Sequence, residues 1–171
     1  MLGLLGSATG LLPAASSEAE VKAAMLYNFL KFVEWNPTAA RPVDSVFVIG
    51  LFAGDSLAPV IERTVSGKLV LGRPVTVREI ESVQAGKAVH VLFLRQGVPA
   101  VRELVQQLHK FGTLTVSDAP RFMEAGGVIQ FTVVENRVRF MINQEAALKA
   151  GLKISSRLLA LSVPGRGEGS Q

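Results

Sequence analysis

The sequence predicts an α/β fold. We expect a three-layer sandwich with a mostly parallel central sheet, an antiparallel hairpin at one edge and a long amphipathic helix at the N-terminus. Residues 45–52 and 88–94 are almost entirely apolar, which is the pattern of strands buried on both faces of a parallel sheet. Helical patterns separate the strands along the chain, as in strand–helix–strand units. A gap of two residues, Glu135 and Asn136, separates two alternating apolar runs and predicts the hairpin.

The length of 171 residues fits a single domain with its own core, which we expect to span residues 18–162. Residues 163–171 are polar and rich in glycine, which predicts a flexible tail. Residues 1–17 are uncharged, rich in Leu and Ala, and end in small residues, as in a secretory signal peptide. No Lys or Arg precedes this run, so either the start codon is placed too late or the segment is an apolar tail.

The first helix is expected at residues 21–35, with more than half of its circumference apolar. Ser17 and Glu20 have the spacing of a capping box before it, and Pro37 is expected to end it. Asn28 falls inside the apolar arc. A buried amide without partners costs about 1–3 kcal/mol, so we expect Asn28 to tie the helix to a neighbouring strand or loop.

The remaining elements follow from apolar periodicity and from turn residues. In chain order they are a strand at 45–52, a helix at 57–65, strands at 75–80 and 88–94, a helix at 98–110, a strand at 113–117, a glycine-ended helical turn at 118–127, hairpin strands at 128–134 and 137–142, and helices at 143–150 and 154–161. Asp55 or Ser56 is the expected N-cap of the second helix. Asn143 is expected to cap the helix that Gly151 ends.

Composition excludes several functional classes. The chain has no Cys, so it has no disulfides, no Cys-ligated zinc and no thiol catalysis. The net charge is +4, and the basic residues are scattered without interleaved aromatics, which argues against nucleic-acid binding. The sequence contains no apolar run of about 18 residues that would predict a transmembrane helix.

Ligands of open parallel sheets bind beyond the carboxyl ends of the strands. The candidate crevice residues at these ends are Gly50, Gly54, Asp55, Ser56, Arg95, Ser117 and Asp118. Two glycines followed by a helix N-terminus are able to hold an anion. The same segment also fits a tight turn with an ordinary cap, and it matches neither a dinucleotide fingerprint nor a Walker loop.

The sequence suggests no catalytic, metal or cofactor site. His90 lies in an apolar strand and His109 ends a helix, and neither has a second ligand at metal-binding spacing, so both are interpreted as structural histidines. No Gly-x-Ser-x-Gly elbow or paired carboxylates are present, so a hydrolase is the least favoured hypothesis.

Seven segments, spread in order from about residue 20 to residue 162, resemble the YfiR-like family of small periplasmic proteins. They are VKAAMLYNFLKFVEW (21–35), KLVLGRPV (68–75), HVLFL (90–94), LTVSD (114–118), FMEAGGVIQF (122–131), VRFMIN (138–143) and AGLKISSRLL (150–159). The residues that match the family's motifs, and that we interpret as structural, are Tyr27, Asn28, Phe29, Phe32, Trp35, Gly126, Gly127, Asn143 and Gly151.

This resemblance implies a non-catalytic regulator that is exported to the periplasm. The family's namesake binds the periplasmic region of an inner-membrane diguanylate cyclase and holds it inactive, until an outer-membrane lipoprotein sequesters it. Cyclic di-GMP and biofilm formation then rise. Related domains precede membrane sensor kinases, so a kinase is an alternative partner. The namesake is a dimer with disulfides. A homodimer is therefore expected here, but disulfide-based redox control is excluded. A periplasmic sensor of a small ligand is the alternative function.

Overall fold

The central sheet of the computed structural model, which describes residues 16–36 and 45–165, has seven strands in the order β3-β4-β2-β5-β6-β7-β8. Their bounds are β2 (Phe47–Phe52), β3 (Leu69–Val70), β4 (Arg73–Ile80), β5 (Val91–Leu94), β6 (Leu114–Ser117), β7 (Ile129–Val134) and β8 (Arg137–Ile142). The five strands from β4 to β7 pair in parallel, and β3 and β8 pair antiparallel at the two edges. The predicted α/β class and the hairpin are confirmed.

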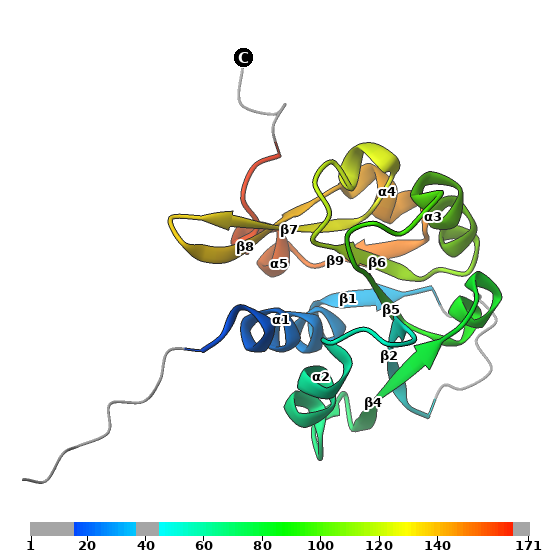
Figure 1. Ribbon diagram of the computed structural model, residues 1–171, viewed down its shortest axis with the longest axis vertical. Coiled ribbons are helices and arrows are strands. Elements are labelled where there is room, and N and C mark those ends of the chain that lie inside the picture. The colour runs from blue at the N-terminus through cyan, green and yellow to red at the C-terminus, as the bar shows by residue number, and fades with distance from the viewer. Residues whose placement is uncertain (1–15, 37–44, 166–171) are drawn as a thin grey trace, which may run out of the picture.

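Helices cover both faces of the curved sheet, as the three-layer prediction requires (Figure 1). Their bounds are α1 (Glu18–Phe32), α2 (Ala58–Val65), α3 (Val101–Lys110), α4 (Gln144–Lys149) and α5 (Ser156–Leu161). One apolar cluster joins the sheet to α1, α2, α4 and α5. A second cluster joins it to α3 and the neighbouring 3-10 turns. The central strands β5 and β6 are therefore buried on both faces, which explains the continuous apolar sequence of β5.

The first helix ends three residues earlier than predicted. Residues Val33–Trp35 form strand β1, which pairs antiparallel with β9 (Leu152–Ile154) in a separate two-stranded sheet. The prediction of Trp35 as helical, and of Ile154 as the start of the last helix, was wrong. In each segment one charged residue lies between two apolar residues. This pattern suits a strand once a partner strand is present.

Asn28 is exposed, so the expectation that it ties the helix to a neighbour was wrong. The buried face of α1 is Ala23, Leu26, Phe29 and Leu30, which is narrower than the apolar arc of the sequence suggested. The excess apolar residues, such as Met25, are half-buried at its margin.

The helix caps agree with the sequence except at α2. Ser17 and Glu20 form the predicted capping box, with Glu20 N–H donating to Ser17 Oγ at 3.2 Å and Ser17 N–H donating to Glu20 Oε2 at 2.7 Å. The Asn143 side chain caps α4 by accepting from Ala146 N–H at 3.0 Å. Helix α2 begins at Ala58. Asp55 instead caps the preceding turn, since its Oδ1 accepts from Leu57 N–H at 2.9 Å.

The ends of the chain extend beyond the described part. Residues 1–15 of the predicted signal peptide and residues 166–171 of the predicted tail lie outside the described residues. Val163 donates its N–H to Phe140 O at 2.8 Å, so the chain after α5 is attached to the outer edge of β8.

Gly127 is expected to be the least replaceable motif glycine. A Cβ at this position would overlap the ring of buried Phe122, so Gly127→Ala overpacks the second apolar cluster. We expect a loss of about 1–3 kcal/mol in the free energy of unfolding, measured by urea denaturation. The control is Asn28→Ala on the exposed side of α1, which is expected to change stability by less than about 0.5 kcal/mol. Equal effects of the two substitutions would contradict this packing.

Candidate functional site

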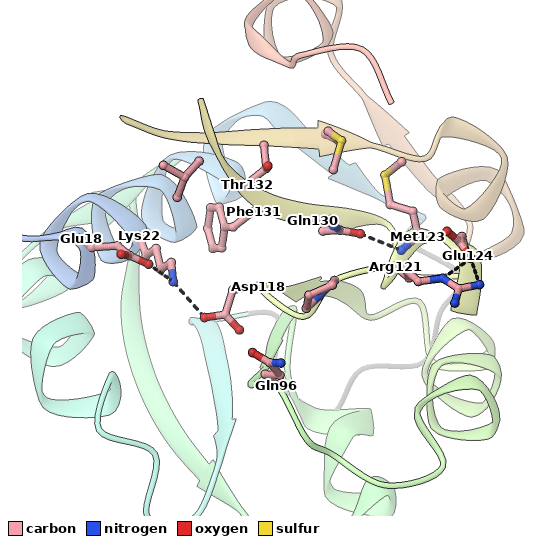
Figure 2. A pocket seen from close by; sticks show the side chains of 13 residues that line it. Glu18, Lys22, Gln96, Asp118, Arg121, Met123, Glu124, Gln130, Phe131 and Thr132 are labelled. Atoms are coloured by element: carbon pink, nitrogen blue, oxygen red, sulfur yellow. Dashed lines mark hydrogen bonds and ion pairs between the residues drawn. The ribbon is translucent and has the colours of Figure 1, made fainter. Parts of the chain in front are cut away.

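A pocket of about 700 Å³, which we call the main pocket, lies at the carboxyl edge of the sheet (Figure 2). The N-terminal turns of α1, the loops after β5 and β6, and the hairpin β7–β8 form its walls. The lining residues are Glu18, Lys22, Gln96, Asp118, Pro120, Arg121, Met123, Glu124, Gln130, Phe131, Thr132, Val133 and Met141.

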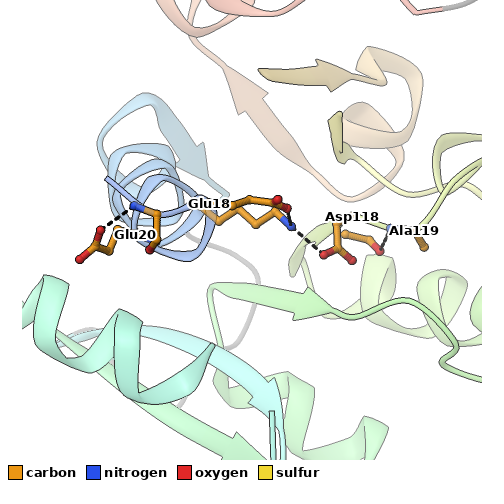
Figure 3. Close-up of polar contacts among 7 residues, drawn as sticks. Glu18, Glu20, Asp118 and Ala119 are labelled. Carbon is orange, nitrogen blue, oxygen red and sulfur yellow. Dashed lines mark hydrogen bonds and ion pairs between the residues drawn. The ribbon is translucent and has the colours of Figure 1, made fainter. Parts of the chain in front are cut away.

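The polar wall of the main pocket is an ion-pair chain from α1 to the loop after β6 (Figure 3). Lys22 Nζ lies 2.8 Å from Asp118 Oδ2 and 2.6 Å from Glu18 Oε1. Burial acts to lower the pKa of Lys22, but the hydrogen bonds and charges of Asp118 and Glu18 outweigh it and raise the pKa above its ordinary value. Lys22 is therefore a fixed cation that positions Asp118.

The loop that carries Asp118 is held from both sides. Ser117 is buried at the end of β6, and its Oγ accepts from Ala119 N–H at 2.9 Å, which fixes a tight turn around Asp118. Asp118 Oδ1 is enclosed and has no hydrogen-bond partner among the described residues. A buried carboxylate oxygen without a donor is costly, so this is the least satisfied polar group of the site.

The opposite wall combines amide and apolar groups. Gln130 Oε1 accepts from Met123 N–H at 3.2 Å, which leaves the Gln130 amide N–H groups toward the pocket (Figure 2). The Phe131 ring and two methionines supply apolar surface, and Lys22 Nζ lies 6.0 Å from the Phe131 ring centroid. Such a pocket suits a small amphipathic molecule or a side chain of a protein partner.

A smaller cavity of about 300 Å³ adjoins the main pocket on the α3 side. Arg95 and Ser117 line it, and it shares Gln96, Pro120 and Arg121 with the main pocket. Arg121 Nη2 pairs with Glu124 Oε2 at 2.7 Å on the surface. Hydrogen bonding to Arg121 lowers the pKa of Glu124, and the reverse contact raises the pKa of Arg121.

The structure brings together three of the seven predicted crevice residues. Arg95, Ser117 and Asp118 line the two adjoining cavities. The other four line neither of them: Gly50, Gly54, Asp55 and Ser56. A Cβ at Gly50 would press on Val89, so this glycine permits close packing within the sheet.

The turn after β2 is bound to the neighbouring strand, since Gly54 N–H donates to Glu79 Oε1 at 3.4 Å. Together with the Asp55 cap on Leu57 N–H, this contact fits the alternative interpretation as an ordinary turn. Lys22 was not among the predicted site residues. The sequence feature that could have indicated Lys22 is its position, one turn from the start of a helix with an apolar face. A lysine that is buried at such a position needs a carboxylate nearby.

Neither histidine belongs to the main pocket. His90 is buried at the amino end of the sheet, where its Nδ1 accepts from Val48 N–H at 3.1 Å and its ring contacts Phe47 and Trp35. It is a core histidine, as predicted. Among the described residues, no three His, Asp or Glu side chains gather in a way that suits a metal ion. In the same part of the chain, no helix has the length and apolarity to cross a membrane.

Several motif residues stabilise the packing interface between α1 and the sheet. The Phe29 ring stacks on Phe131 at 6.0 Å between centroids and meets Phe140 edge-on at 5.2 Å. Gly126 ends the turn after Phe122 with φ +97°, a conformation that favours glycine. Phe131 therefore belongs both to the packing interface with α1 and to the wall of the main pocket.

His109 makes stability depend on pH. Burial lowers its pKa below the ordinary 6.5 and the charge of Lys149 lowers it further, while a hydrogen bond to the Gly126 backbone partly opposes both. The pKa of His109 is lower in the folded state than in the unfolded state. The contribution of neutral His109 to the free energy of unfolding is therefore complete above about pH 6.5 and is lost as the pH falls below that value.

We therefore expect the free energy of unfolding to fall between pH 7.5 and pH 5.5, and to fall less in His109→Gln. Urea denaturation at both pH values measures the two slopes. Identical slopes in the variant and the wild type would show that another group is responsible.

Comparisons with known proteins agree with this fold. Residues 19–163 match the model of the YfiR/HmsC-like family. No curated protein matches the chain. A solved structure of a conserved domain protein from Vibrio cholerae O1 biovar El Tor aligns with a TM-score of 0.57 and 12% sequence identity. The alignment covers 85% of this chain and 59% of that one, so the chain spans less than two thirds of that protein, and the likeness shows the fold alone.

Proposed function

Because the chain belongs to the YfiR/HmsC-like family, we propose that it is a non-catalytic periplasmic regulator that binds and restrains a membrane diguanylate cyclase. The observation that carries the proposal is the match over residues 19–163, which includes nearly all of the described domain. The family is periplasmic and is known as regulatory rather than catalytic. The chain itself would then be exported, and its loss would affect the level of cyclic di-GMP and biofilm formation.

The chemistry of the main pocket is consistent with a binding role. Lys22 is paired with two carboxylates and its pKa is raised, so at neutral pH it is a protonated cation and a poor nucleophile. The Ser117 hydroxyl accepts a backbone hydrogen bond inside a tight turn. These groups hold the loop after β6 in place, which is a structural task.

The proposed partner is the periplasmic region of an inner-membrane diguanylate cyclase, with a sensor kinase as the alternative. An outer-membrane lipoprotein that sequesters the regulator, and a homodimer of the regulator itself, complete the proposal. All of these partners are proposed from family membership alone, and not from any contact within the structure.

The direct test combines a pull-down with a deletion strain. The tagged full chain is expected to retain the periplasmic region of a cyclase encoded beside its gene. Deletion of the gene is expected to raise cyclic di-GMP, since a restraint is removed, and reintroduction of the gene is expected to reverse the rise. Unchanged cyclic di-GMP together with no retained cyclase would contradict the proposal.

A second candidate function is a sensor of small ligands. The observation that favours it is the main pocket, where amide groups, an ion pair and apolar side chains face one space of about 700 Å³. The two functions are compatible, because a ligand in this pocket would also contact α1 and the hairpin.

Thermal-shift screening with amino acids, nucleotides and small anions tests the sensor function. A ligand at about one hundred times its dissociation constant adds about 2.7 kcal/mol of stability. The shift is expected to decrease in Asp118→Asn and to persist in the control Glu145→Gln, which changes an exposed ion pair on α4. A flat screen across all three classes would count against a sensor function.

A further inference from the structure

The tip of the hairpin β3–β4 has an unusual sequence for its backbone conformation. Leu71 and Gly72 both have positive φ, +50° and +74°, as the two central residues of a tight hairpin turn require. Asn, Asp or Gly is the usual first residue of such a turn, because a branched apolar side chain is strained there. Leu71 is nevertheless present, and it is 84% exposed.

The apolar surface continues down the hairpin from its tip. Leu69 is 57% exposed, while Val70 between them is buried in the core and anchors the strand. Leu69 of β3 and Leu71 of the turn therefore face solvent, while Val70 points inward. A Cβ at Gly72 would meet no atom within 4 Å, so the tip stands clear of the rest of the molecule. The hairpin lies next to α2 at the lower end of Figure 1.

Two lysines flank these leucines, and Tyr27 of α1 holds them in place. The Tyr27 hydroxyl donates to Leu69 O at 3.1 Å, which braces the hairpin against α1. Lys31 Nζ and Lys68 Nζ lie 4.2 Å and 4.9 Å from the Tyr27 ring centroid, within cation–π range. Glu62 and Arg63, both exposed in the last turn of α2, carry opposite charges.

We propose that this basic-apolar tip, formed by Tyr27, Lys31, Lys68, Leu69 and Leu71, binds the surface of an anionic lipid bilayer. Leu71 enters the boundary between headgroups and acyl chains, and the two ammonium groups contact lipid phosphates. Apolar insertion combined with a few cations is the arrangement by which proteins lie on a membrane without crossing it.

The shape of the tip favours a bilayer over a protein partner. A protein that received Leu71 would need a matching cavity surrounded by carboxylates, whereas a bilayer accepts any protruding apolar side chain. The net charge of +4 also attracts the whole chain to an anionic surface. The inference does not depend on the proposed function. If both hold, lipid binding concentrates the regulator beside the membrane enzyme.

The absence of Cys permits a site-specific test in the full chain. A polarity-sensitive nitrobenzoxadiazole label is attached at Leu71→Cys and, as a matched control, at Leu148→Cys. Leu148 is 75% exposed on α4, beside the neutral ion pair of Glu145 and Lys149. Each protein is mixed with vesicles of 40% phosphatidylglycerol and 60% phosphatidylcholine, or with pure phosphatidylcholine. Both proteins carry the same residues 1–15, so binding through that apolar segment does not distinguish them.

We expect the label at position 71 to brighten and shift to the blue with anionic vesicles and to respond weakly with neutral ones. The label at position 148 is expected to stay in water. Adding Lys68→Gln to the Leu71→Cys protein is expected to weaken partitioning about five-fold, since one basic residue near an anionic surface contributes about 1 kcal/mol.

Three outcomes would overturn the proposal. Equal responses at positions 71 and 148 would mean non-specific adsorption. A label at position 71 that ignores vesicles but responds to the periplasmic region of a cyclase would assign the tip to a protein contact, and a label that responds to neither would leave it without a binding role.

Discussion

Burial of one side of helix α1 against the sheet is the constraint on which the rest of the structure depends. Leu26, Phe29 and Leu30 are fully enclosed, and the Phe29 ring contacts both Phe131 and Phe140 of the hairpin. A helix with a single narrow apolar face needs fixation at both ends. The pairing of β1 with β9 holds its carboxyl end. The contact of Lys22 with Asp118 holds its amino end and forms a wall of the main pocket.

Local patterns in the sequence were sufficient for most of the fold and insufficient for the long-range contacts. The apolar runs of β2 and β5, the capping box at Ser17 and the cap at Asn143 each follow from neighbouring residues. Strand β1 could not be predicted in this way, because Val33 and Trp35 continue a helical pattern and become a strand only through a partner about 120 positions away. The burial of Asn28 was overestimated for a related reason, since an apolar arc does not reveal how much of it the sheet covers.

The candidate site shows the same division. Arg95, Ser117 and Asp118 were predictable because parallel strands must end at one edge of a sheet. The position of Lys22 near the start of an apolar-faced helix signals a nearby carboxylate, but its pairing with Asp118, 96 positions away, could not be predicted. The resulting site is a pocket of positioned charges beside apolar surface, and the tip of β3–β4 exposes a second kind of surface. Both are suited to binding, in agreement with a family of regulators.

The position of α1 on the sheet depends most directly on its coupling to the loop after β6. A double-mutant cycle with Lys22→Met and Asp118→Asn, measured by urea denaturation, isolates that coupling from the effect of each substitution alone. The account predicts a coupling free energy of about 1–2 kcal/mol, which is reduced from a fully buried pair because Asp118 is partly exposed. Additive effects, within about 0.3 kcal/mol, would show that the ion pair does not fix the helix and would contradict the account.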